Sequence, residues 1–170
     1  MAKFLYYYDD RVIYDAGKLI KTKSGEKDPK IILALETTTL DTIIDNIIFA
    51  SSQDKMSILR ILAHGRPGKS YLGKDGISEI TVDKFKKLKG YFLEGGRIEL
   101  HSCSVAKFCT SGVQCTLGGW LQKLADYTGV SVTAAQITQI ADDNWEWEGM
   151  TSTFNPWKPG DSALLGTYTP

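Results

Sequence analysis

The feature that most limits the fold of this chain is the alternation of short apolar runs with amphipathic segments. Continuous apolar runs are typical of strands that are covered on both faces, as in a parallel sheet. Such runs occupy residues 3–8, 30–36, 57–63, 97–102 and 130–135. Between them, residues 40–53 and 117–129 have helical spacing, and a short helix is expected from Thr81. Because strands that alternate with helices are joined by parallel crossovers, we predict a single α/β domain over residues 1–170.

The composition limits the partners that this domain can have. Twenty basic and 20 acidic side chains cancel, so nucleic acid and anionic membranes are not expected as main partners. The first residues, MAKFLYYYDD, lack the apolar core of a signal peptide, and no apolar run reaches the length of a membrane span. We therefore expect no membrane insertion, and either a cytoplasmic protein or a domain of a larger exported one. The oligomeric state does not follow from the sequence.

The three cysteines do not form a recognisable metal site. Cys103, Cys109 and Cys115 are an odd number, which argues against a disulfide framework. Their spacing does not match zinc-binding patterns, and only His101 is nearby as a fourth ligand. A disulfide between Cys109 and Cys115 stays open for an oxidising compartment. We predict no metal and no cofactor.

The segment RILAHGRPGKSYLG, residues 60–73, allows two interpretations. Its second half is close to a phosphate-binding P-loop, which needs a helix directly after Lys69. Gly73 and Gly76 follow instead, and together they cost about 2 kcal/mol of helix propensity. Read from His64, the segment is a histidine and a glycine at the end of an apolar strand, where a cysteine peptidase can keep its general base. Nucleotide binding is therefore the third alternative.

A cysteine peptidase needs a thiol, an imidazole that helps to form the thiolate, and N–H donors for the oxyanion. His64 follows one predicted strand and Cys103 follows another, so both are expected at the carboxyl edge of the sheet. Gly65 has no side chain, which lets its N–H approach a substrate carbonyl. His101 would share a strand face with Cys103 and is the alternative base.

The local sequence resembles a known family. "ILAHG" followed by "GGRIELHSC" resembles the two-block signature of caspase-like cysteine peptidases, which include caspases, gingipains and clostripain. "HGRPGKSYLG", "GGRIELHSCSVAK", "GGWLQKLADYTGVSVTAA" and "DDNWEWEG" look like the caspase-like domain of large bacterial surface proteins and adhesins. The resemblance covers residues 57–150.

This resemblance implies a caspase-like three-layer α/β/α sandwich with a mostly parallel central sheet. It also implies a polypeptide substrate, with His64 as base, Cys103 as nucleophile, and the N–H groups of Gly65 and Cys103 as oxyanion donors. A catalytically silent interaction module on the same fold is the alternative function.

The resemblance also suggests where substrate binds. In caspase-like peptidases the end of the first strand commonly contributes a charge to the pocket for the P1 side chain. This charge is acidic in members that cleave after Arg or Lys, so Asp9 and Asp10 predict a basic P1 preference; a solvated turn is the alternative. Trp145 and Trp147 are candidate walls of a substrate cleft, and packing under a long loop is the alternative for them.

Overall fold

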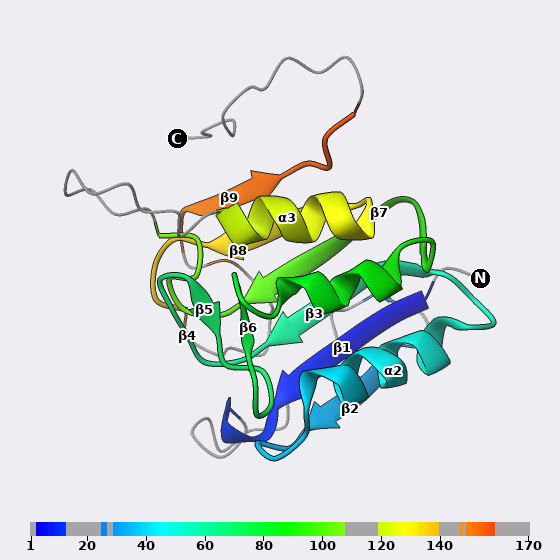
Figure 1. Cartoon of the computed structure of the whole chain (residues 1–170), viewed down its shortest axis with the longest axis horizontal. Coiled ribbons are helices and arrows are strands. Elements are labelled where there is room, and N and C mark those ends of the chain that lie inside the picture. Colours follow the sequence, from blue (N-terminus) through cyan, green and yellow to red (C-terminus); the bar gives the residue numbers. More distant parts are fainter. Residues whose placement is uncertain are drawn as a thin grey trace.

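The computed structural model describes residues 3–12, 25–26, 29–107, 119–139, 147 and 149–158 (Figure 1). A six-stranded sheet has the order β2-β1-β3-β7-β8-β9. Its strands are β1 (Lys3–Asp9), β2 (Lys30–Ala34), β3 (Met56–Leu62), β7 (Phe92–His101), β8 (Ser131–Ala135) and β9 (Thr151–Phe154). All neighbouring pairs are parallel except β8 with β9. The predicted α/β class with a mostly parallel central sheet is confirmed, and the arrangement is consistent with an α/β/α sandwich.

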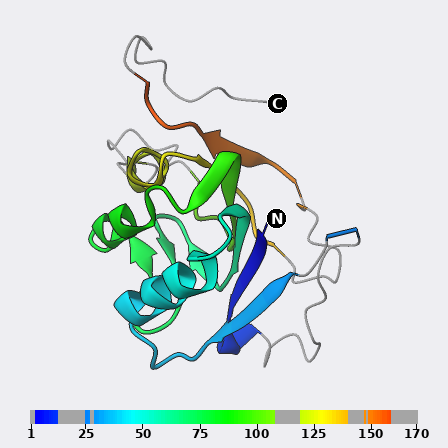
Figure 2. The same ribbon diagram turned by 90° about the vertical axis from the view of Figure 1, so that its right-hand side faces the viewer.

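Three helices pack on one face of the sheet (Figures 1 and 2). They are α2 (Leu40–Ser51), the 3-10 helix η1 (Val82–Leu88) and α3 (Gly119–Thr128). A short helical turn at residues 10–12 directly follows β1. Alternate strand residues such as Leu59 and Leu100 point into the same core as Ile43, Phe85 and Trp120 of the helices. No helix among the described residues is long and apolar enough to cross a bilayer. The main core therefore lies between this helical layer and the sheet.

The edge strand β2 departs from the expectation. Residues 30–36 were expected to be covered on both faces, yet β2 is the outermost strand and pairs only with β1 among the described strands. Ile31 and Leu33 are each 43% exposed and Leu35 is 51% exposed, whereas Ala34 faces the core. An apolar run thus indicated a strand correctly, but it did not reveal that one face of this strand is open.

The segment with P-loop spacing folds into a small antiparallel sheet. It contains β4 (Gly65–Arg66), β5 (Lys69–Ser70) and β6 (Ile77–Ser78). Gly68, with a φ of 82°, makes the turn between β4 and β5, because a positive φ is readily adopted only by glycine. Within residues 29–107 no helix begins directly after Ser70. The helix N-terminus that a P-loop would place against phosphate is therefore missing from this segment.

Candidate active site

His64 and Cys103 leave two neighbouring parallel strands at the same edge of the sheet. Leu62, near the end of β3, is in register with His101, the last residue of β7. The pairing continues past the strand ends, since the N–H of Ala63 donates to the carbonyl of His101 at 3.4 Å. His64 and Cys103 each follow two residues beyond the Leu62–His101 pair, so the structure places both residues at the carboxyl edge, after neighbouring strands.

Gly65 packs directly against the backbone of Cys103. A Cβ at Gly65 would lie 2.7 Å from the carbonyl oxygen and 2.9 Å from the nitrogen of Cys103, and 2.8 Å from Cγ1 of Val105. These separations are too short for any side chain. The absence of a Cβ at Gly65 is therefore what allows the His64 segment and the Cys103 turn to touch.

Replacing Gly65 with alanine is expected to disrupt the candidate site while the sheet stays folded. The new methyl group meets backbone atoms that cannot rotate away, so the two segments must separate. We expect a loss of about 1–3 kcal/mol in the free energy of unfolding, measured by urea titration, and a loss of Cys103 reactivity larger than this destabilisation explains. Gly119→Ala is the matched control, because Gly119, like Gly65, has no positive φ, and its Cβ would meet only Oε2 of Glu79 at 3.9 Å.

The turn that carries Cys103 has an unusual backbone. Ser104 has a φ of 53°, and it is the one non-glycine residue with positive φ in the described part of the chain. A serine in this conformation is strained, and such strain is concentrated at functional sites. The turn is held by the last residue of β8 and the segment after it, since the N–H of Ser104 donates to the carbonyl of Ile137 and that of Ala106 donates to the carbonyl of Ala135, both at 2.9 Å.

The thiol of Cys103 is free and partly exposed. Its Sγ lies 3.4 Å from both the backbone nitrogen and the carbonyl oxygen of Gln139, so it can accept from one and donate to the other. Both contacts are with backbone atoms, and neither involves a charged group. Sequence reasoning missed Gln139 and Ser104, because residues beyond 136 gave no periodic pattern and a left-handed serine leaves no trace in the sequence.

His64 is exposed, and its backbone is anchored on both sides. Its carbonyl accepts from the N–H of Tyr71 at 2.8 Å, which ties it to the chain just after β5. On the nucleophile side, the hydroxyl groups of Ser70 and Ser102 lie 2.8 Å apart and are buried. This contact therefore joins the small sheet to the residue between β7 and Cys103.

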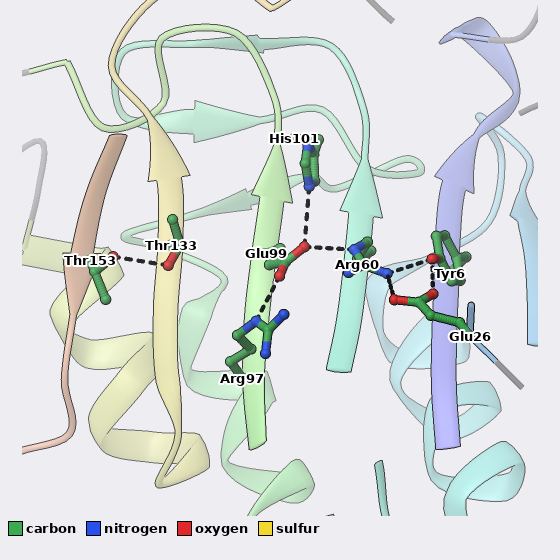
Figure 3. Close-up of polar contacts among 8 residues, drawn as sticks. All are labelled: Tyr6, Glu26, Arg60, Arg97, Glu99, His101, Thr133 and Thr153. Carbon is green, nitrogen blue, oxygen red and sulfur yellow. Dashed lines mark hydrogen bonds and ion pairs between the residues drawn. The ribbon is translucent and has the colours of Figure 1, made fainter. Parts of the chain in front are cut away.

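His101, the alternative base, belongs to a buried polar network (Figure 3). Its side chain is 4% exposed, and its Nε2 lies 3.4 Å from Oε2 of Glu99. The imidazole stacks on Trp147, with ring centroids 4.0 Å apart and planes inclined by 7°. Trp147, expected as a wall of the substrate cleft, therefore covers His101. The exposed His64 fits the role of base better than this buried residue.

The network extends from Glu99 across three strands (Figure 3). Arg60 of β3 donates to Glu99 at 2.6 Å and to Glu26 at 2.6 Å, and it also contacts the hydroxyl of Tyr6 in β1. Burial by itself would raise the pKa of Glu99. The hydrogen bond from His101, the charge of Arg60 and the hydrogen bonds from Arg97 and Arg60 outweigh it and lower this pKa to about 2. Glu99 is therefore an ionised carboxylate inside the protein.

The two aspartates at the end of β1 have different surroundings. Asp9 is fully buried; its Oδ1 accepts from Nε of Arg11 at 2.5 Å, and its Oδ2 accepts from Nη2 of Arg11 at 2.8 Å and from the N–H of Gly73 at 2.7 Å. The hydrogen bond from Arg11 to Asp9 raises the pKa of Arg11. The negative charge of Asp9 is thus already balanced by Arg11 within the protein. In contrast, Oδ1 of Asp10 is buried without a hydrogen-bond partner.

Some predicted residues lie outside the described part of the chain. These are Trp145, Cys109 and Cys115. Among the described residues, no group of three or more His, Cys, Asp or Glu side chains is arranged to hold a metal ion.

Comparison with known proteins identifies a family. The family model described as a domain of unknown function, DUF4347, matches residues 10–169. No curated protein and no solved structure matches the chain. Because the family model covers far more than half of the sequence, the chain belongs to the DUF4347 family.

Proposed function

We propose that this domain is a cysteine endopeptidase in which Cys103 is the nucleophile and His64 is the general base. The observation that carries the proposal is the junction of the two strand ends, where the His64–Gly65 segment touches the backbone of Cys103. A free, partly exposed thiol and an exposed imidazole that follow the ends of two neighbouring strands have the composition of a thiol peptidase site.

In the proposed mechanism, His64 takes the proton from the Cys103 thiol, and the thiolate attacks the carbonyl carbon of the scissile bond. The N–H groups of Gly65 and Cys103 stabilise the oxyanion of the tetrahedral intermediate. The carbon–nitrogen bond then breaks, and the leaving amine receives the proton from His64. A water molecule, deprotonated by His64, hydrolyses the thioester and regenerates the thiol.

The close packing of Gly65 on Cys103 supports the assignment of these two N–H donors. The nitrogen of Cys103 lies within 2.9 Å of the position that a Gly65 Cβ would occupy, so both backbone segments belong to one small region. The strained Ser104 that follows Cys103 supports it further, because strain of this kind fixes backbone donors before substrate binds.

The proposal is tested by covalent labelling of the intact domain. A peptide acyloxymethyl ketone with lysine at P1 is incubated with the wild type, His64→Ala and Cys103→Ala, and the intact mass is measured over time. We expect one label on the wild type, none on Cys103→Ala, and greatly slowed labelling of His64→Ala. Labelling that is equally fast in the wild type and in His64→Ala would contradict the dyad.

We further propose a preference for a basic P1 side chain that depends on Asp10. Tyr8 of β1 is in register with Leu62 of β3, so Asp10 and His64 each follow two residues beyond this pair. The unpartnered Oδ1 of Asp10 is able to accept a charge-assisted hydrogen bond from an Arg or Lys side chain. The Asp9 carboxylate already holds Arg11 and Gly73.

Replacing Asp10 with asparagine is expected to reduce cleavage after Arg and Lys by roughly tenfold or more relative to cleavage after norleucine, because a charge-assisted hydrogen bond is worth about 1.5–3 kcal/mol. A positional-scanning peptide library measures the profile. Asp9→Asn is the matched control: it weakens the clamp on Arg11 and lowers the stability, but it leaves the ratio between P1 side chains unchanged. An Asp10→Asn variant with the wild-type profile would refute the assignment.

A further inference from the structure

Two cations lie directly opposite each other in the hairpin of β4 and β5. Arg66 of β4 pairs with Lys69 of β5, and Pro67 and Gly68 form the turn between them. A proline followed by a glycine with positive φ, here 82°, is the sequence that a type II turn prefers. The turn is also anchored, because the N–H of Gly68 donates to the carbonyl of Val105 at 3.5 Å. The fold therefore holds the two positive residues next to each other.

The two cations lie on the outer face of this hairpin. Side chains alternate between the faces of a strand, so Lys69 and Tyr71 point to one side and Ser70 points to the other. Ser70 is fully buried, and its hydroxyl lies 2.8 Å from that of Ser102. Arg66, in contrast, is exposed, and Lys69 and Tyr71 are half-buried. The face that carries both cations is thus open to a ligand.

Both charged groups gather at the ring of Tyr71. The guanidinium carbon of Arg66 lies 5.9 Å from the centre of this ring, and the ammonium nitrogen of Lys69 lies 5.5 Å from it. The stem of Lys69 also packs closely on Gly76, since a Cβ at Gly76 would lie 2.6 Å from Cε of Lys69. The two positive charges are therefore gathered around one aromatic ring.

Neither Arg66 nor Lys69 forms an ion pair with a carboxylate in the part of the chain that the structure describes. Other cations of the protein do have such partners, as Arg11 has in Asp9. Like charges at directly opposite positions of two strands repel each other and destabilise the pairing. A carboxylate bound between the two cations would offset this repulsion. The pair therefore has the properties of a site for an acidic group.

This site lies next to the candidate base. Gly65 pairs with Ser70, and the pairing continues to His64, whose carbonyl accepts from the N–H of Tyr71 at 2.8 Å. His64 and Arg66 are two residues apart, so strand alternation places them on the same face of the hairpin. In the proposed mechanism His64 gives its proton to the leaving amine. The leaving-group side of a substrate would therefore lie along the face that carries the two cations.

We propose that Arg66 and Lys69 form a subsite for an aspartate or glutamate side chain at P1′ or P2′ of a polypeptide substrate. This inference rests on the proposed peptidase function. The substrate carboxylate accepts charge-assisted hydrogen bonds from the guanidinium and the ammonium group. Together with the basic P1 preference, the preferred substrate has a positive residue before the scissile bond and a negative residue after it.

The first test compares internally quenched peptides with lysine at P1 that differ only in glutamate or glutamine at P1′ or at P2′. We expect the wild type to cleave one of the two glutamate peptides with at least about fivefold higher kcat/KM than its glutamine counterpart. This ratio should fall to about one in the Arg66→Gln, Lys69→Gln double variant and should decrease with added salt. Lys74→Gln is the matched control, because Lys74 is an exposed lysine outside the pair, and it should keep the ratio. Cleavage without a preference for glutamate would overturn the subsite.

The second test separates this inference from the peptidase proposal, because it needs no cleavage. Fluorescent forms of the same peptides are titrated with Cys103→Ala, and binding is measured by anisotropy. We expect tighter binding of a glutamate peptide, and the difference should vanish when Arg66→Gln and Lys69→Gln are added. If no peptide is cleaved but this difference is found, the acidic subsite stands and the peptidase proposal fails. Equal binding of the glutamate and glutamine peptides, or a difference that survives without the two cations, would overturn the subsite.

Discussion

Replacing Cys103 with alanine is expected to abolish peptide cleavage while leaving the domain folded. The change removes one sulfur atom at a partly exposed position, where Sγ contacts the backbone nitrogen and carbonyl oxygen of Gln139, so the free energy of unfolding should change by less than about 1 kcal/mol. Loss of the nucleophile should lower kcat/KM by roughly 10⁴-fold or more, measured with an internally quenched peptide pool.

His64→Ala should lower kcat/KM to a similar level, because nucleophile and base act as one unit and their losses do not add. It should also slow the alkylation of Cys103 by iodoacetamide near neutral pH, since the imidazole no longer accepts the thiol proton. Cys109→Ala and Cys115→Ala are the matched controls and should retain the wild-type rate. If folded Cys103→Ala kept the full biological effect of the domain, the silent interaction module would be the better account.

Replacing Arg60 with leucine is expected to cost about 3–5 kcal/mol in the free energy of unfolding, because it leaves two buried carboxylates without their shared cation. Arg97→Leu is the matched control. Arg97 also donates to Glu99, at 2.7 Å, but its side chain is 44% exposed whereas that of Arg60 is 3% exposed. Its loss should cost less than about 1 kcal/mol. If the two variants lost the same free energy of unfolding, the burial of Arg60 would not explain its contribution to stability.

The same network predicts how stability responds to acid. The pKa of Glu99 is about 2 in the folded protein and near its ordinary value of 4.5 when unfolded, so the unfolded state binds the proton first. The stabilisation is therefore complete above about pH 5 and is lost as the pH falls towards 2, by about 3 kcal/mol in total. Glu99→Gln should remove this part of the acid dependence. If the free energy of unfolding of the wild type and of Glu99→Gln fell in parallel between pH 5 and pH 2, the proposed role of Glu99 in acid sensitivity would be contradicted.

The elements with strong periodicity were predictable from the sequence. The length and composition of the apolar runs were enough to predict β1, β3 and β8. The apolar stripe over residues 40–53 was enough to predict α2. The small strands β4, β5 and β6 were missed, because two-residue strands carry no periodic signal and depend on contacts with the rest of the fold. β9 was missed because it is short and polar on its open side.

The candidate site was predictable in position but not in its surroundings. The alternation of strands and helices placed His64 and Cys103 at one edge, since parallel strands all end on the same side. The sequence did not reveal that Asp9 forms an ion pair with Arg11. The adjacent aspartates Asp9 and Asp10 look alike in the sequence, and nothing there indicates which side chain turns into the protein. Nor did it link Trp147 to His101, since the two residues are brought together only by the fold.

The hydrogen bonds from the Cys103 turn to the segment after β8 have a consequence for biosynthesis. Ile137 and Gln139 emerge from the ribosome well after Cys103, and they contact Ser104 and the Cys103 thiol. A nascent chain that ends at Gly129 carries both His64 and Cys103, but it lacks the backbone groups of Ile137 and Gln139 that contact the Cys103 turn. The turn that carries Cys103 can therefore take up its folded conformation only after most of the domain has been translated.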